Sequence, residues 1–215
     1  DNLPPAEQWP ALEFTLPELQ YPQQLNAAAA LIDDAVRSFG AERPALLTPD
    51  GNAWSYGELQ RHANQVAQVL VEDLGIVPGN RVMLRSPNNP WLVAAWLGVL
   101  KAGAVVVTIM PALRASEIRT LLELTGPAAA LCDSRFLADL AEAAGNDVPV
   151  LAMGGSTGTD LVARCAAKSG EFSAVPTAAD DVALLGPTSG TTGTPKITMH
   201  FHRDILANAD TFARH

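Results

Sequence analysis

The segment at residues 186–196 combines the residue types that bind phosphate groups. It follows a short apolar run at residues 182–185. Glycine has no side chain, so Gly190 and Gly193 let the backbone adopt positive φ values and point several amides at one anion. Lys196 adds a full positive charge, and hydroxyl side chains add further donors. The candidate phosphate-binding residues are Thr188, Ser189, Gly190, Thr191, Thr192, Gly193, Thr194 and Lys196. Together they predict a loop that holds a triphosphate.

The residue order around Lys196 differs from that of a Walker A loop. A Walker A loop needs glycine immediately before its lysine and a hydroxyl residue after it, whereas Pro195 and Ile197 flank Lys196. The pattern therefore does not favour a P-loop NTPase. A glycine- and threonine-rich surface linker remains the plain alternative. Residues 154–159 have a similar composition without a basic residue, and we expect an ordinary loop there.

Apolar strands alternate with helices from residue 78 onward. We expect strands at residues 82–84, 104–109, 128–132, 148–152 and 182–185, with helices at 91–100, 116–124, 135–144 and 161–168 between them. Strands that are apolar at successive positions are buried on both faces, which is typical of a parallel sheet covered by helices. The sequence thus predicts an α/β fold with a mainly parallel sheet layered with helices. Ligands bind at the carboxyl ends of strands in such sheets, where the phosphate loop begins.

The chain divides into three predicted parts. Five prolines make residues 1–25 an extended leader, because proline lacks an amide donor and disfavours helix in the residue before it. Residues 26–177 form the first α/β portion of a large domain. Residues 178–215 hold a strand, the phosphate loop, a short extended piece at 197–199 and a helix from about Arg203 that reaches the chain end without a cap.

Two capping signals mark helices in the first α/β portion. Asn26 can cap a helix that continues to Phe39 and ends at Gly40. Ser55 and Glu58 have the spacing of a capping box, followed by apolar residues at helical intervals up to residue 70. Between these helices, the turn-forming residues 49–52 separate two short apolar runs. This pattern predicts a β-hairpin.

Composition limits the classes of partner. The 215 residues are 48% apolar and 17% charged, which is enough to form a buried core. The net charge of −9 with no basic cluster disfavours nucleic-acid binding. Two distant cysteines suggest neither a zinc site nor a disulfide scaffold, and the first ten residues lack signal-peptide features, so we expect a cytoplasmic protein. Residues 91–110 are long enough to imitate a membrane span, but Lys101 favours a buried helix followed by a strand.

Other residues that could do chemistry have simpler interpretations. His200 and His202 have the alternate spacing of a metal-binding pair on a strand, but no third ligand is identifiable, so we predict no metal site. Trp91 and Trp96 are expected in the core rather than in a substrate pocket. Asp180 and Asp181 are adjacent, so on a strand they would face apart, and they are interpreted as a solvated start to the strand.

Several motifs of this chain resemble those of the adenylate-forming superfamily, which includes acyl-CoA synthetases, peptide-synthetase adenylation domains and luciferases. Residues 188–196 (TSGTTGTPK) resemble its signature loop. Residues 54–59 (WSYGEL) and 100–105 (LKAGAV) resemble its first two motifs, and residues 78–82 and 86–90 also occur where that family places them. The resemblance extends from about residue 25 to the end. Ile197 stands where many members carry glycine.

The resemblance implies a two-step reaction. A carboxylate attacks the α-phosphate of ATP and releases pyrophosphate, and coenzyme A then captures the acyl-adenylate. The loop from Thr188 to Thr194 would hold the β- and γ-phosphates. Lys196 would be the catalytic residue that neutralises charge on the departing pyrophosphate, usually together with Mg²⁺. The implied partners are ATP, coenzyme A and a small-molecule carboxylic acid, which itself supplies the nucleophile.

Residues 199–204 (MHFHRD) and 108–114 (TIMPALR) most resemble aryl-acid:CoA ligases, above all the 2-aminobenzoate-CoA ligase group, with benzoate as a second substrate. In that family the adenine, ribose and acyl contacts and a mobile C-terminal domain come later in the sequence. We therefore expect this chain to be an N-terminal fragment that forms no thioester alone. A non-catalytic nucleotide-binding or interaction module remains the alternative.

Overall fold

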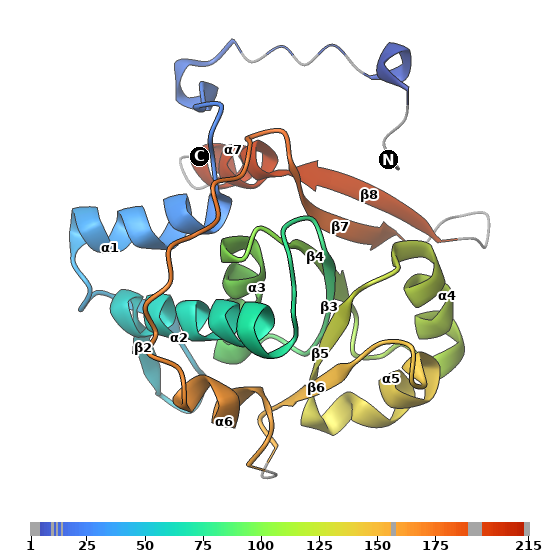
Figure 1. Ribbon diagram of the computed structural model, residues 1–215. Helices are drawn as coiled ribbons and strands as arrows, with labels where there is room; N and C mark the ends of the chain where they lie inside the picture. The colour runs from blue at the N-terminus through green and yellow to red at the C-terminus, as the bar shows by residue number, and fades with distance from the viewer. Residues whose placement is uncertain are drawn as a thin grey trace.

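A six-stranded, mainly parallel sheet lies at the centre of the computed structural model, which describes residues 5–9, 11, 13, 15–155, 158–188 and 195–212 (Figure 1). Its strands are β3 (Arg81–Arg85), β4 (Val105–Ile109), β5 (Ala129–Asp133), β6 (Val150–Met153), β7 (Val182–Thr188) and β8 (Lys196–Phe201). Their order across the sheet is β6-β5-β3-β4-β7-β8. Neighbouring strands are parallel except β7 and β8, which are antiparallel. The predicted α/β class is confirmed.

Helices cover both faces of this sheet. On one face lie α2 (Tyr56–Gln68), α3 (Pro90–Lys101) and α6 (Leu161–Ala166), and on the other lie α4 (Ala115–Thr125) and α5 (Leu137–Ala144). Successive residues of β3 point to opposite faces: Val82 and Leu84 join the core beneath α2 and α3, while Met83 joins the core beneath α4 and α5. Because side chains on both faces of the strand are buried, its sequence is a continuous apolar run.

The predicted hairpin and its following helix are confirmed. Strands β1 (Pro44–Leu47) and β2 (Ala53–Ser55) pair antiparallel as a separate two-stranded sheet. At the start of α2, the Glu58 amide donates to Ser55 Oγ at 3.2 Å and the Ser55 amide donates to Glu58 Oε2 at 2.8 Å. The predicted capping box is therefore present, and the helical path continues through a π-helical turn, η4 (Val69–Asp73).

Asn26 caps the first long helical stretch as predicted. Its Oδ1 accepts from the amides of Ala28 and Ala29 at 3.1 and 3.3 Å. The stretch is a π-helical turn, η3 (Ala29–Asp33), that continues into α1 (Asp34–Phe39), so the predicted uniform helix differs locally in winding. The π-helical turn positions Asp33 for an ion pair with Lys101, described below.

Two 3₁₀ turns, η1 (Ala6–Gln8) and η2 (Pro17–Leu19), interrupt the proline-rich start of the chain. This segment runs above the last helix, α7 (His202–Phe212), in Figure 1. Gln24 then forms an isolated antiparallel bridge with Ala178. This bridge ties the start of the chain to the segment that leads into β7.

A third 3₁₀ turn, η5 (Ser134–Phe136), leads from β5 into α5.

The strand that precedes the phosphate loop is longer than predicted. The expected strand ended at Leu185, but β7 continues through Thr188. The expected extended piece after the loop is likewise a full strand, β8. The reason is pairing: Gly186, Pro187 and Thr188 lie opposite Thr198, Ile197 and Lys196. Backbone hydrogen bonds therefore order residues whose types alone indicated a loop.

Residues 91–110 form a helix followed by a strand, α3 and β4, as predicted. Trp91 and Trp96 are half-buried and pack against the core, in agreement with their expected role. Within the described part of the chain, every helix is too short or too polar to cross a membrane. Cys132 and Cys165 are both buried and free.

Candidate functional site

The two ends of the predicted phosphate loop are held together at the carboxyl end of β7. Thr188, the last residue of β7, pairs with Lys196, the first residue of β8, and Thr188 Oγ1 donates to the Lys196 carbonyl at 3.2 Å. Both residues are exposed. The candidate residues between them, Ser189, Gly190, Thr191, Thr192, Gly193 and Thr194, lie outside the described residues. The fold therefore places the first and last candidate residues together at the edge where ligands bind in open α/β sheets.

A close contact between β7 and β8 explains one glycine of the motif. Thr198 Oγ1 donates to the Gly186 carbonyl at 3.0 Å. A Cβ atom at Gly186 would lie 2.9 Å from the same hydroxyl, closer than side chains ordinarily approach. Gly186 is therefore needed for the cross-strand contact that aligns the hairpin, rather than for a flexible loop.

A pocket of about 650 Å³ opens beside the ends of the loop. One side of its lining is formed at the end of β4 and in the segment that leads into α4. The other side lies at the ends of the loop. The lining includes Ile109, Met110, Leu113, Ser116, Glu117, Thr188 and Pro195. The Glu117 carboxylate accepts a hydrogen bond from the Arg114 amide at 2.9 Å, so one of its oxygens caps the start of α4. The pocket thus joins an apolar wall to Thr188 and Pro195 at the two ends of the loop.

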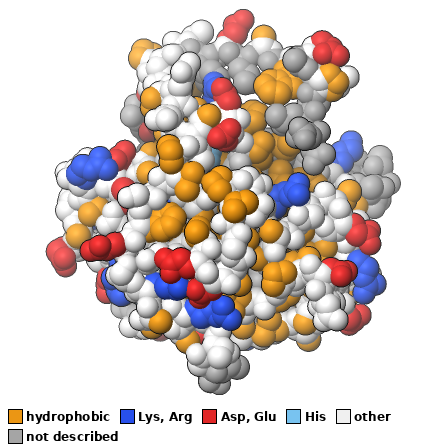
Figure 2. Space-filling view, in the orientation of Figure 1, with side chains coloured by type: hydrophobic (Ala, Val, Ile, Leu, Met, Phe, Trp, Pro, Cys, Tyr) orange, Lys and Arg blue, Asp and Glu red, His pale blue; other side chains and the backbone are white. Residues whose placement is uncertain are grey.

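Charges are mixed over the face shown in Figure 2. Basic and acidic side chains alternate there, and no extended basic patch is visible among the residues drawn in colour. Binding a polyanion requires clustered positive charge, and the side chains drawn in colour on this face form no such cluster.

The structure separates His200 from His202. His200 is exposed on β8, whereas His202 is 1% exposed and its Nδ1 accepts the Ala27 amide at 3.1 Å. Burial lowers the pKa of His202 to about 4, with a smaller opposing effect from Asp181. His202 therefore joins the start of α7 to the first helical stretch. The described residues contain no group of three or more His, Cys, Asp and Glu side chains arranged to hold a metal.

The pair Asp180 and Asp181 lies at the start of β7 as expected, and both residues are exposed. The Asp180 carboxylate forms an ion pair with Arg203. The Asp181 side chain accepts the Ala178 amide at 2.8 Å, and its backbone carbonyl accepts the His202 amide at 3.2 Å. These aspartates organise the junction between β7 and α7 and are engaged with the chain itself.

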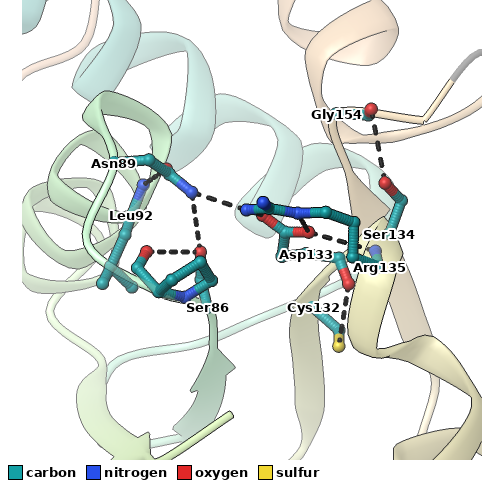
Figure 3. A network of polar contacts seen from close by, with 9 residues as sticks. Ser86, Asn89, Leu92, Cys132, Asp133, Ser134, Arg135 and Gly154 are labelled. Carbon is teal, nitrogen blue, oxygen red and sulfur yellow. Dashed lines mark hydrogen bonds and ion pairs between the residues drawn. The ribbon is translucent and has the colours of Figure 1, made fainter. Parts of the chain in front are cut away.

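A polar network that sequence reasoning missed lies at the carboxyl ends of β3 and β5 (Figure 3). Asn89 Nδ2 donates to Ser86 Oγ at 2.9 Å and to Asp133 Oδ2 at 3.3 Å. The Arg135 side chain binds the same carboxylate: its Nε donates to Asp133 Oδ1 and its Nη2 donates to Asp133 Oδ2, each at 2.9 Å. Hydrogen bonds from the Arg135 side chain hold the pKa of Asp133 below its usual range.

This network occupies the point where the order of the strands reverses. From β3 the chain crosses to β4 on one side, and from β5 it crosses to β6 on the other. Crevices in open α/β sheets form at such points. The sequence signal was the polar run that follows β3, Ser86 to Asn89, but only the fold shows that Asp133, from a distant strand, meets it.

The comparisons with known proteins agree with this geometry. A family model described as an AMP-binding enzyme matches residues 32–215. Benzoate–CoA ligase of Thauera aromatica is 30% identical over 204 residues, which cover 93% of this chain and 38% of that protein. The 3-hydroxybenzoate–CoA ligase of Aromatoleum sp. strain CIB is 30% identical over 189 residues, covering 85% of this chain and 35% of that protein.

The fold is also found in a solved structure. The crystal structure of ATP-bound MatB from Rhodopseudomonas palustris aligns with a TM-score of 0.78 and 28% identity, covering 88% of this chain and 37% of that one. The chain thus spans little more than a third of the length of these proteins. The family match extends over most of the chain, including the β7–β8 hairpin and the pocket beside it. The chain belongs to the AMP-binding enzyme family.

Proposed function

We propose that this chain is the N-terminal part of an ATP-dependent ligase that joins an aromatic carboxylic acid to coenzyme A. The observation that carries the proposal is the β7–β8 hairpin, which pairs Thr188 with Lys196 beside a pocket at the carboxyl edge of the sheet. The loop between these two residues therefore begins and ends at that edge. The family match supports ATP as the substrate that it binds.

The proposed reaction proceeds through two displacements. A carboxylate oxygen of the acid forms a bond to the α-phosphorus of ATP, and the bond from that phosphorus to the β-phosphate bridging oxygen breaks, which releases pyrophosphate. The thiol of coenzyme A then forms a bond to the acyl carbon, loses its proton and releases AMP. Neither displacement needs a nucleophile from the protein.

We infer that Lys196 stabilises the departing pyrophosphate. Its exposed ammonium group lies at the end of the loop proposed to hold the β- and γ-phosphates. Negative charge grows on these phosphates as the bond to the α-phosphate breaks, and a fixed positive charge lowers the barrier to that step. Mg²⁺, when bound to the nucleotide, would neutralise further phosphate charge. The exposed ammonium group of Lys196 suits a ligand that carries phosphate groups.

Two observations support an aromatic acid as the substrate. The relatives described above are named for benzoate and 3-hydroxybenzoate. Residues 199–204 of this chain also resemble the 2-aminobenzoate-CoA ligase group. We therefore propose 2-aminobenzoate or benzoate as the preferred acid, in a cytoplasmic enzyme.

The test is a pyrophosphate-release assay of the full gene product that carries this chain. The assay compares 2-aminobenzoate, benzoate, 3-hydroxybenzoate, acetate and a long-chain fatty acid, each with ATP and Mg²⁺, and mass spectrometry identifies the acyl-adenylate and the thioester. We expect the aromatic acids to rank first. A fatty acid ranked first would overturn the substrate class, and nucleotide binding without pyrophosphate release from any acid would favour a non-catalytic module.

A further inference from the structure

Arg85 is a charged side chain that the proposed reaction does not use, yet it is buried in the centre of the sheet. It is the last residue of β3, and its side chain is only 1% exposed. Burial of an isolated charge is costly unless polar partners compensate for it. The guanidinium group of Arg85 therefore needs polar partners inside the fold.

The guanidinium group of Arg85 connects the loops that follow the two neighbouring strands. Its Nη1 donates to the Phe136 carbonyl, after β5, at 2.6 Å. Its Nη2 donates to the carbonyls of Pro111 and Leu113, after β4, at 2.7 and 2.6 Å. Because β3 lies between β4 and β5 in the sheet, one side chain at its end holds the loops on both sides.

Carbonyl groups, rather than a paired carboxylate, are the main partners of this charge. The nearest carboxylate oxygen, of Asp139, is 3.7 Å from Nη2, beyond hydrogen-bond distance. Arginine presents several donors in a planar fork, so it can hold three carbonyls in two directions. A lysine keeps the charge but has a single ammonium centre, which cannot reproduce the spacing of Nη1 and Nη2.

The loop held by Arg85 forms one wall of the pocket beside the phosphate loop. Met110 and Leu113 line the pocket on this side, while Thr188 and Pro195 line it beside the loop. Arg85 itself is not among the residues of the lining, so it acts on the pocket only through the carbonyls that it binds. If this wall shifts, the pocket changes shape beside Thr188 and Pro195, the residues at the two ends of the phosphate loop.

We propose that Arg85 is a positioning residue that holds the segment from Met110 to Leu113 and thereby sets the affinity of the site for ATP. This inference rests on the proposed function, because it assigns ATP to the loop between Thr188 and Lys196. Arg85 does not touch the reacting atoms. The wall that it holds faces Pro195, the neighbour of Lys196, so substitution of Arg85 should raise the KM for ATP more than it lowers kcat.

The experiment compares R85K with R81K in the full gene product. Arg81 begins the same strand at the end opposite the pocket, so R81K makes the same chemical change away from it. We expect R85K to raise the KM for ATP about tenfold and to lower kcat by a smaller factor. Hydrogen exchange at residues 110–114 should become at least about tenfold faster in R85K and stay unchanged in R81K.

An unchanged KM for ATP in folded R85K, or an equal rise in R81K, would overturn the proposal. If R85K does not fold, R85Q repeats the comparison with a shorter neutral donor. If the parent protein releases no pyrophosphate with any acid, the proposed function fails and the assignment to ATP fails with it. The exchange rates at residues 110–114 would still show whether Arg85 holds this loop.

Discussion

The imidazole of His202 accepts a hydrogen bond from the backbone amide of Ala27, which joins the two ends of the fold at a distance of 3.1 Å. The acceptor is a buried ring nitrogen, and only a deprotonated nitrogen can accept. The contact therefore depends on the neutral form of His202. Residues separated by 175 positions are joined by a bond that acid can break.

We expect acid to destabilise the fold through His202. Burial lowers the pKa of the folded side chain to about 4, whereas the unfolded chain titrates near 6.5. Below pH 6.5 the unfolded state binds a proton that the folded state does not, so stability falls as the pH drops toward 4 and this contribution is constant below it. A pKa difference of this size between the folded and unfolded states corresponds to about 3 kcal/mol of unfolding free energy.

The measurement is urea unfolding at pH 7 and pH 4.5 of the parent and H202Q. Glutamine keeps an oxygen acceptor but does not titrate, so the loss of stability between the two pH values should be smaller in H202Q. Comparing the two proteins cancels the effect of carboxylates with lowered pKa values, such as Asp133. An identical loss in both proteins would contradict the role given to His202.

The buried ion pair of Lys101 and Asp33 leads to a second prediction. Lys101 Nζ lies 2.5 Å from Asp33 Oδ1, the lysine side chain is 0% exposed, and Gln60 donates to the same carboxylate oxygen at 2.7 Å. Substitution K101M removes one charge and leaves the carboxylate partly buried, which should cost about 3–5 kcal/mol of unfolding free energy. Denaturant unfolding measures this loss.

The matched control for K101M is the double variant K101M/D33N. Asparagine keeps an oxygen that can accept from Gln60 but carries no charge, so the double variant should recover a large part of the lost stability. If D33N added to K101M lowers stability further, the cost of K101M came from packing rather than from the stranded charge.

Close packing of α2 on α3 leads to a third prediction. A Cβ atom at Gly98 would lie 2.6 Å from Val66 Cγ1 and 2.8 Å from the Ala63 carbonyl oxygen. Alanine favours helix over glycine by about 1 kcal/mol, but overpacking of this kind costs about 1–3 kcal/mol and here involves backbone as well. We expect G98A to lower the thermal midpoint.

Two further variants test the explanation for Gly98. G155A places its Cβ no closer than 3.5 Å to a neighbour and should be nearly neutral. V66A removes Cγ1, the atom nearest to the new Cβ, but keeps the Cβ of residue 66, which lies 2.7 Å away. G98A should therefore destabilise somewhat less in the V66A background than in the parent. Equal effects in both backgrounds would exclude the contact with Val66 Cγ1 as the cause.

Local patterns predicted the elements whose residues contact their own neighbours in sequence. The capping box of Ser55 and Glu58 is an example, because both hydrogen bonds span three residues. The mainly parallel sheet followed from strands that were apolar on both faces, such as Val82 to Leu84. These features depend on residue type and spacing, which the sequence displays directly.

Features that depend on distant partners could not be predicted. Residues 186–188 looked like a loop, because the pairing of β7 with β8 that orders them is not encoded by their own types. The type and position of Arg85 do not reveal its role, because its partners, the Pro111 and Phe136 carbonyls, come from distant parts of the sequence. The same holds for Asp133, whose partner Asn89 is 44 positions away.

The last prediction concerns Lys196 in the full gene product. Substitution K196A should slow adenylate formation far more than thioester formation from pre-made acyl-adenylate. A fixed ammonium group stabilises the charge that develops on the leaving pyrophosphate, and loss of one such donor typically costs about 100- to 1,000-fold in rate. The second half-reaction releases AMP and has no pyrophosphate to stabilise, so its rate should stay close to that of the parent.

Single-turnover measurements of the two half-reactions decide between the roles open to Lys196. K196R retains the charge and should recover part of the adenylation rate, because a guanidinium group also binds phosphate. Near-parental rates of both half-reactions in K196A would mean that Lys196 is only a surface charge at the start of β8. Equal slowing of both would instead indicate misfolding or a role in holding the adenylate. Selective loss of the first step would place Lys196 at the departing pyrophosphate.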